Sequence, residues 1–525
     1  MLRNGAQYLK SLRDGRKIYL GGKLVDDVTT HPGFRNSARS FARLYDLKSD
    51  PHYVDRLSFE QDGQRHSFYF KQPRNLEDLR FRMAGHKAWA DASCGLFGRS
   101  PDHVGSFITG MTCRPDVFDV PKQGFRQSLL DYYTYIRDND LYVCYATHPP
   151  QGARNYSSDA SAHFFKSPAL HVSATDEQGI TLHGMKTLAT GGAFCDEIWI
   201  GNLTPLAPDR IKEAVTCALP VNSPGLSLWS RRSMEQAAPN SFDYPLSSRF
   251  DESDCMLVCD NVKVPWSRVF TIGNVDLSRA IYMETGGHYF GNHQSNVRFW
   301  SKLQLIVGLA NKIAKSAGVR GIPAVQETLG KLAAMEATIA GLIAGQVADH
   351  QPVGDGYVMV NQRYMYAALS WCQDNYGLIC ATVRELMGGA IFQMPADISI
   401  IDDGRMNAIF ETYWATEHET ALDRMKLYKL AWDMLASEFG ARHVQYENFY
   451  AGPPFLVRAH SMRLAPWHSF DGTVDALMAS YGPPADGGAG SSAPSQQKAG
   501  EFAKQPGNSP RVSSAIGLLM DRRDT

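Results

Sequence analysis

The sequence lacks a charge excess of either sign. Its 525 residues include 53 Lys and Arg against 54 Asp and Glu, which gives a formal net charge of −1. A balanced chain creates no long-range field that would draw nucleic acid or an anionic membrane surface to it. Cysteine is also scarce, because the nine cysteines are scattered without a CxxC pair or a metal-ligand spacing. We therefore expect reduced, mostly buried thiols and no metal site.

Long apolar runs and several familiar motifs are missing as well. The longest runs, such as residues 303–310, are far shorter than the roughly 20 residues of a membrane-spanning helix. The charged N-terminus has no apolar core like that of a secretory signal, so we expect a cytoplasmic protein. There is no strand-linked GxGxxG fingerprint, GxxxxGK[ST] loop, GxSxG elbow or HExxH pair. An NAD(P)H-binding domain is therefore not expected in this chain.

The first half of the chain predicts a helical domain followed by a β domain. Within residues 1–147, the segments 75–93 and 127–139 space their apolar residues as amphipathic helices do. A short extended piece is expected at 67–70. Residues 148–279 alternate short extended runs with Gly and Pro turns, which indicates a β sandwich or barrel.

The second half predicts a helix bundle and a tail. Residues 280–480 contain long segments with apolar residues at intervals of three and four, the pattern of packed helices. These segments are 297–318, 324–350, 364–388 and 417–439. Residues 481–525 are rich in Gly, Ser, Pro and Ala, so we expect a disordered tail.

Residues 241–266 have the most distinctive sequence in the chain. A polar, charged connection at 247–254 leads into a predicted strand at 255–259. A turn at 260–261 separates it from a second short strand that ends at Pro265. Alone, this pattern describes a piece of scaffold.

The wording of 241–266, with that of 8–20 and 26–36, resembles the oxygenase component of the two-component 4-hydroxyphenylacetate 3-hydroxylase family. The resemblance implies an α+β multidomain fold of the acyl-CoA dehydrogenase type. That fold has an N-terminal helical domain, a central β-barrel or sandwich and a C-terminal four-helix bundle. It also implies a homotetramer that receives FADH2 from a separate NAD(P)H:flavin reductase and uses O2 as co-substrate.

The chemistry implied by the resemblance is hydroxylation of a phenol ortho to its hydroxyl group through a flavin C4a-hydroperoxide, which a dry pocket protects. A phenol similar to 4-hydroxyphenylacetate is the first expectation for the substrate. Chloro- and nitrophenols, and tyrosine-derived intermediates of natural-product pathways, remain open.

Residues 98–103, GRSPDH, follow a predicted helix and open a loop that is similar to the family's GR[ST]PD loop. The resemblance implies that Arg99 lies beside flavin and substrate, where its donor fork suits a phenolate. A surface arginine at a helix end is the plain alternative. His103, expected at the substrate, stands where the 4-hydroxyphenylacetate enzymes have Tyr, which argues against that substrate.

Two further segments are similar to parts of the family that line the flavin. Residues 144–154 match with a one-residue gap, which puts Tyr145 where the family has a substrate-contacting His. His148 is the nearby substitute, with a solvated loop histidine as the alternative, and His148 and Gln151 are expected at the cofactor.

The other segment, residues 186–193, ends a predicted strand with two glycines, which suits the close approach of a flat ring system. Thr190 is expected to hydrogen-bond the flavin, and Gly191 and Gly192 to lie beside the substrate. A simple bend or bulge in the strand is the alternative reading.

Two histidines before the bundle are candidates for the base that deprotonates the phenol. His288 is preferred and His293 is second, because a His in this region is the base in relatives that act on halogenated and nitro phenols, and imidazole suits the task. A satisfied structural histidine is the alternative for either.

The end of the predicted bundle carries the remaining candidates. Residues 437–443 predict a helix that stops at glycine. Residues 446–452 resemble the family's Y-E-x-x-Y-x-G segment, which implies contacts to the flavin ribityl and phosphate groups. The residues assigned to the cofactor there are Tyr446, Asn448, Phe449 and Tyr450.

Three rival functions share features with this sequence. A 4-hydroxybutyryl-CoA dehydratase shares the architecture but needs an iron–sulfur cluster, and Arg99 and His103 lie where it has two of its cysteines. An acyl-CoA dehydrogenase needs a catalytic carboxylate, for which Glu411 or Glu417 would have to serve. A non-enzymatic flavin-binding protein is the third.

Overall fold

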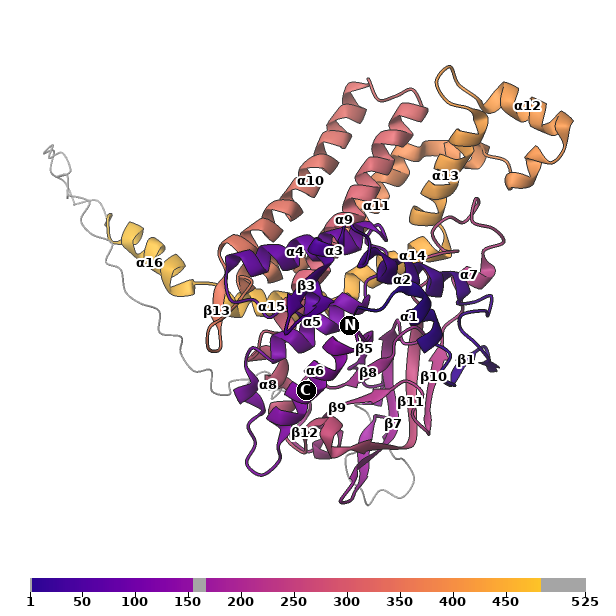
Figure 1. The fold of residues 1–525 in the computed structure, drawn as a ribbon. Helices are drawn as coiled ribbons and strands as arrows, with labels where there is room; N and C mark the ends of the chain where they lie inside the picture. Colours follow the sequence, from indigo (N-terminus) through magenta and orange to yellow (C-terminus); the bar gives the residue numbers. More distant parts are fainter. Residues whose placement is uncertain (1, 154–166, 483–525) are drawn as a thin grey trace, which may run out of the picture. The chain divides into compact units, whose positions relative to one another are not determined.

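The computed structural model describes residues 2–153 and 167–482. The chain separates into a large unit, Met1–Ala465, and a small unit, Pro466–Thr525, whose described helix is α16 (Trp467–Met478). The predicted order of a helical, a β and a second helical region is confirmed in the large unit (Figure 1). The tail expected at 481–525 lies almost wholly outside the described residues. No described helix combines the length and apolarity that crossing a membrane requires.

The N-terminal region is mainly helical, as predicted. Its helices are α1 (Gly5–Ser11), α2 (Arg35–Leu47), α3 (Val54–Leu57), α4 (Leu76–Asp91), α5 (Pro101–Met111) and α6 (Phe125–Asp138). The Asn75 side chain caps α4 by accepting a hydrogen bond from the backbone of Asp78, and Pro101 supplies the first residue of α5. The extended piece expected at 67–70 is wrong, because Phe68–Phe70 form a buried 3-10 turn.

Two sheets make up the β region. One has the strand order β2-β1-β10-β11-β7-β6 and the other β12-β9-β8-β5. Their strands are β1 (Ile18–Leu20), β2 (Lys23–Val25), β5 (Val143–Ala146), β6 (His171–Thr175), β7 (Gly179–Thr190), β8 (Glu197–Ile200), β9 (Val215–Pro220), β10 (Leu226–Ser230), β11 (Asp254–Pro265) and β12 (Val269–Ile272). Because β1 pairs in parallel with β10, the N-terminal segment completes a sheet whose other strands come much later in the chain. The separate hairpins are β3 (Ser58–Gln61) with β4 (Gln64–Ser67) and β13 (Gln351–Val353) with β14 (Tyr357–Met359).

The strand, turn and strand expected at 255–265 are one continuous strand, β11. Its partner β7 runs alongside both halves, pairing Gly184 with Cys259 and Leu182 with Val262. The two residues between them are accommodated by a register shift, and Asn261 adopts a positive φ of 53°. The local turn signal is therefore a β-bulge, because pairing with a long neighbour keeps the chain from reversing.

The second helical region contains the predicted bundle. Its long helices are α9 (Gly287–Ser316), α10 (Pro323–Ala348), α11 (Gln362–Met387) and α13 (Ala421–Leu435), and shorter ones are α8 (Leu277–Met283), α12 (Gly404–Trp414), α14 (Glu438–Phe449) and α15 (Pro454–Leu464), with α7 (Met234–Ala237) in the β region. The helix expected at 417–439 is two helices, because the Ser437 side chain accepts from the backbone of Gly440 and starts α14. Gly440 therefore lies inside a helix and is not a helix stop.

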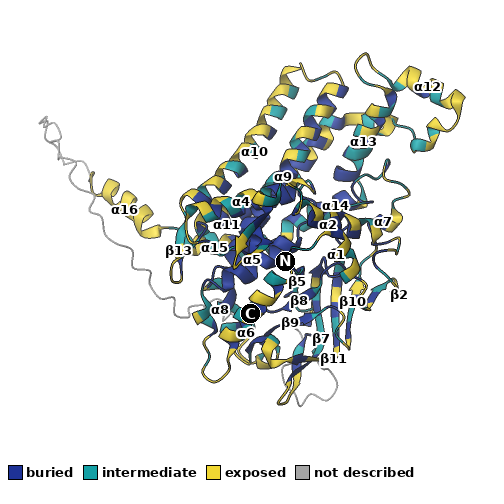
Figure 2. Ribbon diagram, in the orientation of Figure 1, coloured by how far each residue is buried: buried dark blue, intermediate teal, exposed yellow. Residues whose placement is uncertain are grey.

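Helix α9 begins ten residues before the predicted start at 297. Its first turns are buried on all sides, between α5 on one side and α11 on the other (Figure 2). A helix that is buried all round has no face exposed to water, and the buried half of α9 carries polar residues among apolar ones, so its sequence does not show an amphipathic period. This buried half of α9 carries His288, His293 and Gln294 into the interior.

Candidate active site

The backbone at Arg99 is held from two directions in the turn before α5. The amides of Gly98 and Arg99 donate to Glu252 Oε2 at 2.8 Å and 3.1 Å. The hydroxyl of Tyr142 donates to the Arg99 carbonyl. Residues 101–103, expected in a loop, form the first turn of α5, so His103 lies one helical turn from Arg99.

The Arg99 side chain is fixed by two hydrogen bonds and by aromatic rings. Its Nη1 lies 2.8 Å from His103 Nε2, and its Nη2 donates to the Tyr450 carbonyl at 2.6 Å. The guanidinium carbon is 3.8 Å from the centre of the Tyr450 ring and 5.1 Å from that of Tyr145. Arg99, His103, Tyr145 and Tyr450, predicted from separate segments, are therefore brought together.

His103 is a neutral, fully buried imidazole. Its Nδ1 lies 3.0 Å from Gln294 Oε1, and its ring packs 5.1 Å from that of Phe107 and 5.5 Å from that of Tyr145. Burial, and then the positive charge of Arg99, hold the pKa of His103 well below its usual range. Since both ring nitrogens have partners, His103 positions Arg99 and has no further donor for a substrate.

His148 lies at the end of β5, half-buried, and Gln151 is exposed beyond it. The His148 carbonyl accepts a hydrogen bond from Thr187 at 2.8 Å, which attaches this segment to β7. Burial, followed by the charges of Lys186 and Arg99, lowers the pKa of His148 to about 4. His148 therefore faces the interior near Arg99, whereas Gln151 does not join the buried cluster.

Thr190 and the two glycines lie at the end of β7. The Thr190 hydroxyl donates to Asp254 Oδ1 at 2.7 Å, so it can only accept from a ligand. Gly191 has φ of 79°, and a Cβ there would lie 2.1 Å from Tyr142 Oη. Gly191 is thus needed for the contact between Tyr142 and Arg99, and Gly192 is buried beside it, near Leu228.

The two candidate bases point to different places. His288 Nδ1 lies 2.9 Å from the Tyr366 hydroxyl, and its ring is 6.1 Å from Phe107, which also packs against His103. His293 Nδ1 lies 2.8 Å from Gln346 Oε1 on α10. Burial is the main cause that lowers the pKa of each to about 3. His288 therefore lies beside the cluster around Arg99, whereas His293 faces helix α10 of the bundle.

Helix α14 contributes a pair of tyrosines. The Tyr450 ring lies between two guanidinium groups, 3.8 Å from Arg99 and 4.4 Å from Arg298, and its hydroxyl donates to the Gly98 carbonyl at 2.5 Å. The Tyr446 hydroxyl is buried without a partner among the described residues, and a Cβ on Gly98 would lie 2.1 Å from it. Phe449 faces away, since it is half exposed, whereas Asn448 is partly buried and its carbonyl accepts from Gln373 Nε2 at 3.1 Å.

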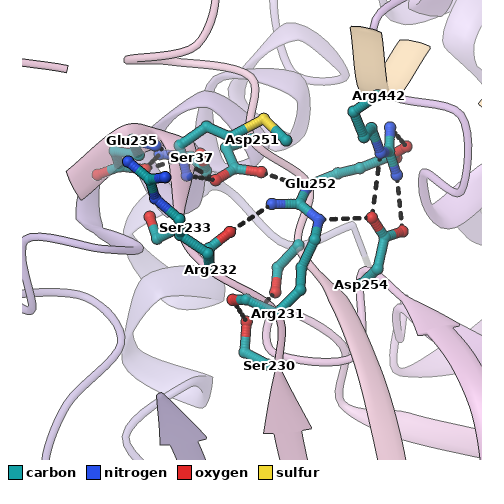
Figure 3. A network of polar contacts seen from close by, with 12 residues as sticks. Ser37, Ser230, Arg231, Arg232, Ser233, Glu235, Asp251, Glu252, Asp254 and Arg442 are labelled. Carbon is teal, nitrogen blue, oxygen red and sulfur yellow. Dashed lines mark hydrogen bonds and ion pairs between the residues drawn. The ribbon is translucent and has the colours of Figure 1, made fainter. Parts of the chain in front are cut away.

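The polar connection expected at 247–254 is the largest feature that the sequence did not reveal. Asp251 and Glu252 are buried, and Asp254 is partly buried, in a network with Arg231 and Arg442 (Figure 3). Arg442, on α14, contacts Glu252 at 3.0 Å and Asp254 at 2.7 Å. Although burial opposes it, the two arginines hold the pKa of Asp254 well below its usual range. A run of charged residues ordinarily indicates a segment exposed to solvent. Only the fold shows that these charges are paired inside the protein.

Comparison with known proteins identifies the family. The N-terminal model described as 4-hydroxyphenylacetate 3-hydroxylase matches residues 4–271, and the C-terminal model of that name matches residues 278–479. The chain belongs to the 4-hydroxyphenylacetate 3-hydroxylase family. As a member of this family it is a monooxygenase, and the predicted resemblance is confirmed.

The curated relatives of this family differ in their substrates. The chain is 34% identical to the 4-hydroxyphenylacetate 3-monooxygenase oxygenase component of Thermus thermophilus, over 86% of this chain and 92% of that one. It is 32% identical to a 4-nitrophenol 2-monooxygenase oxygenase component of a Rhodococcus species, over 87% and 88%. It is 30% identical to the pyoverdin chromophore biosynthetic protein PvcC of Pseudomonas aeruginosa, over 88% and 92%. Identity at this level does not single out one substrate.

Solved structures confirm the fold of the 4-hydroxyphenylacetate 3-hydroxylase family in this chain. The oxygenase component HpaB in complex with FAD and 4-hydroxyphenylacetate superimposes with a TM-score of 0.85 at 29% identity, covering 91% of this chain and 98% of that one. An archaeal 4-hydroxybutyryl-CoA dehydratase from N. maritimus has a TM-score of 0.80 at 17% identity, covering 94% and 98%, which shows the shared fold alone. Among the residues the structure describes, no three His, Cys, Asp or Glu side chains gather to hold a metal.

The residues around Arg99 fit a flavin of the kind this family uses. The buried hydroxyls of Thr147 and Tyr446 lack a hydrogen-bond partner within the described ranges, and Thr190 keeps acceptor capacity. Buried polar atoms without partners are costly, and a ring system with several donor and acceptor heteroatoms would satisfy them. Thr147 directly follows β5, Thr190 ends β7 and Tyr446 lies on α14, so a ligand that reached all three would join the β region to the second helical region.

Proposed function

We propose that this chain is the oxygenase component of a two-component monooxygenase that uses FADH2 and O2 to hydroxylate a phenol ortho to its hydroxyl group. One observation carries the proposal: the Arg99 guanidinium is fixed by His103 and by the Tyr450 carbonyl, among the rings of Tyr145 and Tyr450. A fixed cation between aromatic rings suits a planar substrate that becomes an anion.

FADH2 would come from a separate NAD(P)H:flavin reductase. The names of the curated relatives, which call them oxygenase components, support this division of labour. Thr147, Thr190, His148, Tyr446 and the backbone around Gly191 would hold the flavin. When bound, it supplies the activation of O2, for which the proposal includes a C4a-hydroperoxide. A homotetramer in the cytoplasm is part of the same proposal.

Arg99 would bind the phenol oxygen and stabilise its negative charge. The guanidinium has five N–H donors, and only part of them is used by His103 and Tyr450. Charge-assisted hydrogen bonds of this kind are stronger than neutral ones, and they favour the phenolate over the phenol. The phenolate is the more electron-rich form at the ortho carbon. The contact between Arg99 and the phenol oxygen would therefore both bind the substrate and activate it.

His288 would accept the phenol proton. It is neutral because burial and neighbouring positive charge lower its pKa to about 3, so a ring nitrogen is free of a proton at ordinary pH. Phe107 connects its ring to that of His103, whereas His293 faces Gln346. We therefore propose His288 as the base and assign His293 to the packing of α9 against α10.

The substrate is proposed to be a simple phenol similar to 4-hydroxyphenylacetate. Halogenated or nitro phenols and tyrosine-derived intermediates are the second candidate, favoured by one observation. His103 offers no free donor, and Tyr145 stands where a histidine was expected from the resemblance. Arg99 and the proposed base His288 would therefore supply the polar contacts to the phenol oxygen, without a donor from His103.

Rapid mixing tests the proposed function. The full-length protein with reduced FAD is mixed under anaerobic conditions and then exposed to oxygen, with and without a panel of phenols and an added flavin reductase. We expect a transient C4a-hydroperoxyflavin absorbance, consumption of at least one phenol and a catechol or quinone product. Oxidation of the flavin without that transient and without loss of any phenol would show that the proposal is wrong.

A further inference from the structure

A chain of buried hydrogen bonds runs from Arg99 to the carboxylate of Asp102. Arg99 Nη1 lies 2.8 Å from His103 Nε2, and His103 Nδ1 lies 3.0 Å from Gln294 Oε1. The Gln294 amide then donates from Nε2 to Asp102 Oδ1 at 3.2 Å. His103, Gln294 and Asp102 are each 1% exposed, so water does not compete for these contacts.

The direction of every bond in this chain is determined by its two ends. A guanidinium can only donate, so His103 Nε2 must accept and its proton must lie on Nδ1. An ionised carboxylate can only accept, so the Gln294 NH2 group must face Asp102 and its oxygen must face His103. One orientation of the Gln294 amide and one tautomer of His103 meet both requirements.

A second branch reaches the same carboxylate from the other side. Asp102 Oδ2 lies 2.8 Å from His86 Nδ1, and His86 Nε2 lies 3.5 Å from the hydroxyl of Ser106. Arg82 donates to that hydroxyl at 2.9 Å. Asp102 therefore receives two branches that each begin at an arginine, and its Oδ1 also accepts from the Ser100 hydroxyl, so both of its oxygens are held.

We propose that Gln294 is a positioning residue for the phenol site, which sets the tautomer of His103 and so holds the Arg99 guanidinium toward the phenol oxygen. The inference rests on the proposed function and adds a residue on α9 that no sequence pattern indicated. Without the Gln294 oxygen, the His103 proton has no acceptor at Nδ1, and the imidazole is free to rotate or change tautomer. A proton on Nε2 would then face the Arg99 N–H and displace the guanidinium.

The ionisation of bound 4-nitrophenol gives a direct test, because only its ionised form absorbs strongly in the visible range. The full-length protein is titrated with 4-nitrophenol at several pH values, with FAD in both cuvettes so that its absorbance cancels. In the wild type, Arg99 should lower the pKa of the bound phenol. In Gln294→Met that pKa should be higher by about one unit, since a misplaced guanidinium stabilises the phenolate less.

Two controls separate positioning from general damage. Gln304→Met makes the same change on an exposed face of α9 and should leave the pKa of the bound phenol unchanged. In a His103→Leu background, Gln294→Met should add no further change if Gln294 acts through His103. Gln294→Asn keeps the amide but withdraws it from His103, and it replaces the Met variant if that protein does not fold.

Each outcome decides between the two proposals. A wild type that does not bind 4-nitrophenol, or binds it without lowering its pKa, overturns this inference, and a wild type that also neither binds nor consumes any phenol of the panel overturns the proposed function. A wild type that binds 4-nitrophenol as the phenolate, with equal pKa values in the wild type and in Gln294→Met or Gln294→Asn, overturns the positioning role alone. An additive effect of Gln294→Met in the His103→Leu background would also contradict it.

Discussion

Glu252 joins Arg99 to Arg442 through the two oxygens of one buried carboxylate. Oε2 accepts from the Arg99 amide at 3.1 Å, and Oε1 lies 3.0 Å from Arg442 Nη1. The turn before α5, the start of β11 and helix α14 are therefore held together at the candidate active site. The segment with the most distinctive wording in the sequence supplies this carboxylate.

Removing the charge of Glu252 should therefore lower both stability and activity. Glu252→Gln leaves Arg442 with one carboxylate partner fewer in a dry site, so we expect the free energy of unfolding to fall by about 2–4 kcal/mol. Substrate binding should weaken with it, since the single oxygen of Gln cannot accept from the Arg99 backbone and from Arg442 at the same time. Thermal unfolding and KM for the phenol measure the two effects. Glu438→Gln, which removes an exposed ion pair with Arg232, should change neither.

The planar guanidinium of Arg99 should be essential for hydroxylation of the phenol, and a positive charge alone at this position should not suffice. Arg99→Lys keeps the charge but cannot bridge His103 and the Tyr450 carbonyl in one plane. We expect kcat/KM for the phenol to fall by about 100-fold, with more of the oxygen released as hydrogen peroxide. Peroxide formed per flavin oxidised measures the uncoupling. Arg74→Lys, at an exposed arginine stacked on Tyr357, is the matched control and should behave like the wild type.

His288 and His293 should differ in their effect on the reaction. His288→Gln should lower kcat by about 100-fold or more if His288 removes the phenol proton, and His293→Gln should change kcat far less. Since the pKa of His288 is lowered to about 3, no loss of rate from its protonation is expected between about pH 5 and pH 9. Equal losses of kcat in both variants would contradict the assignment of the base.

Buried neutral histidines should make the protein sensitive to acid. In the unfolded chain His293 takes up a proton below about pH 6.5, whereas in the folded chain its pKa is lowered to about 3 by burial. The unfolded state therefore binds more protons between these values, and stability falls as the pH falls. For His293 alone we expect a loss of about 3 kcal/mol by about pH 4.5. Thermal unfolding at several pH values should show a smaller acid loss for His293→Gln than for the wild type.

Gly191 should tolerate no side chain. A Cβ there meets Tyr142 Oη at 2.1 Å in a backbone with φ of 79°, so Gly191→Ala should break the bond from Tyr142 to the Arg99 carbonyl. We expect a loss of about 1–3 kcal/mol and a fall in activity. Gly308→Ala, on α9 with open space around it, should be neutral or slightly stabilising. A stable and active Gly191→Ala enzyme would show that this contact has no role.

Features that depend on a single segment of the chain were easier to predict than contacts between segments that lie far apart in the sequence. The helices predicted at 75–93 and 364–388 are confirmed by α4 and α11, and the second of these has one apolar and one polar face. Arg99 was identified from a local motif. Gln294 was missed because the polar residues in the buried half of α9 pair inside the protein instead of facing water, and its role depends on Asp102 and His103.

By itself, the sequence determined the order of a helical, a β and a second helical region, the family, and most of the side chains that meet at Arg99. These properties follow from local wording and from periodicity along single segments. Only the tertiary structure decided that β11 is continuous, that the charges at 251–254 are paired inside the fold, and that His288 rather than His293 approaches the aromatic cluster. The reason is physical: a carboxylate or an imidazole acquires its role from its burial and from its partners, and those partners come from strands and helices far apart in the chain.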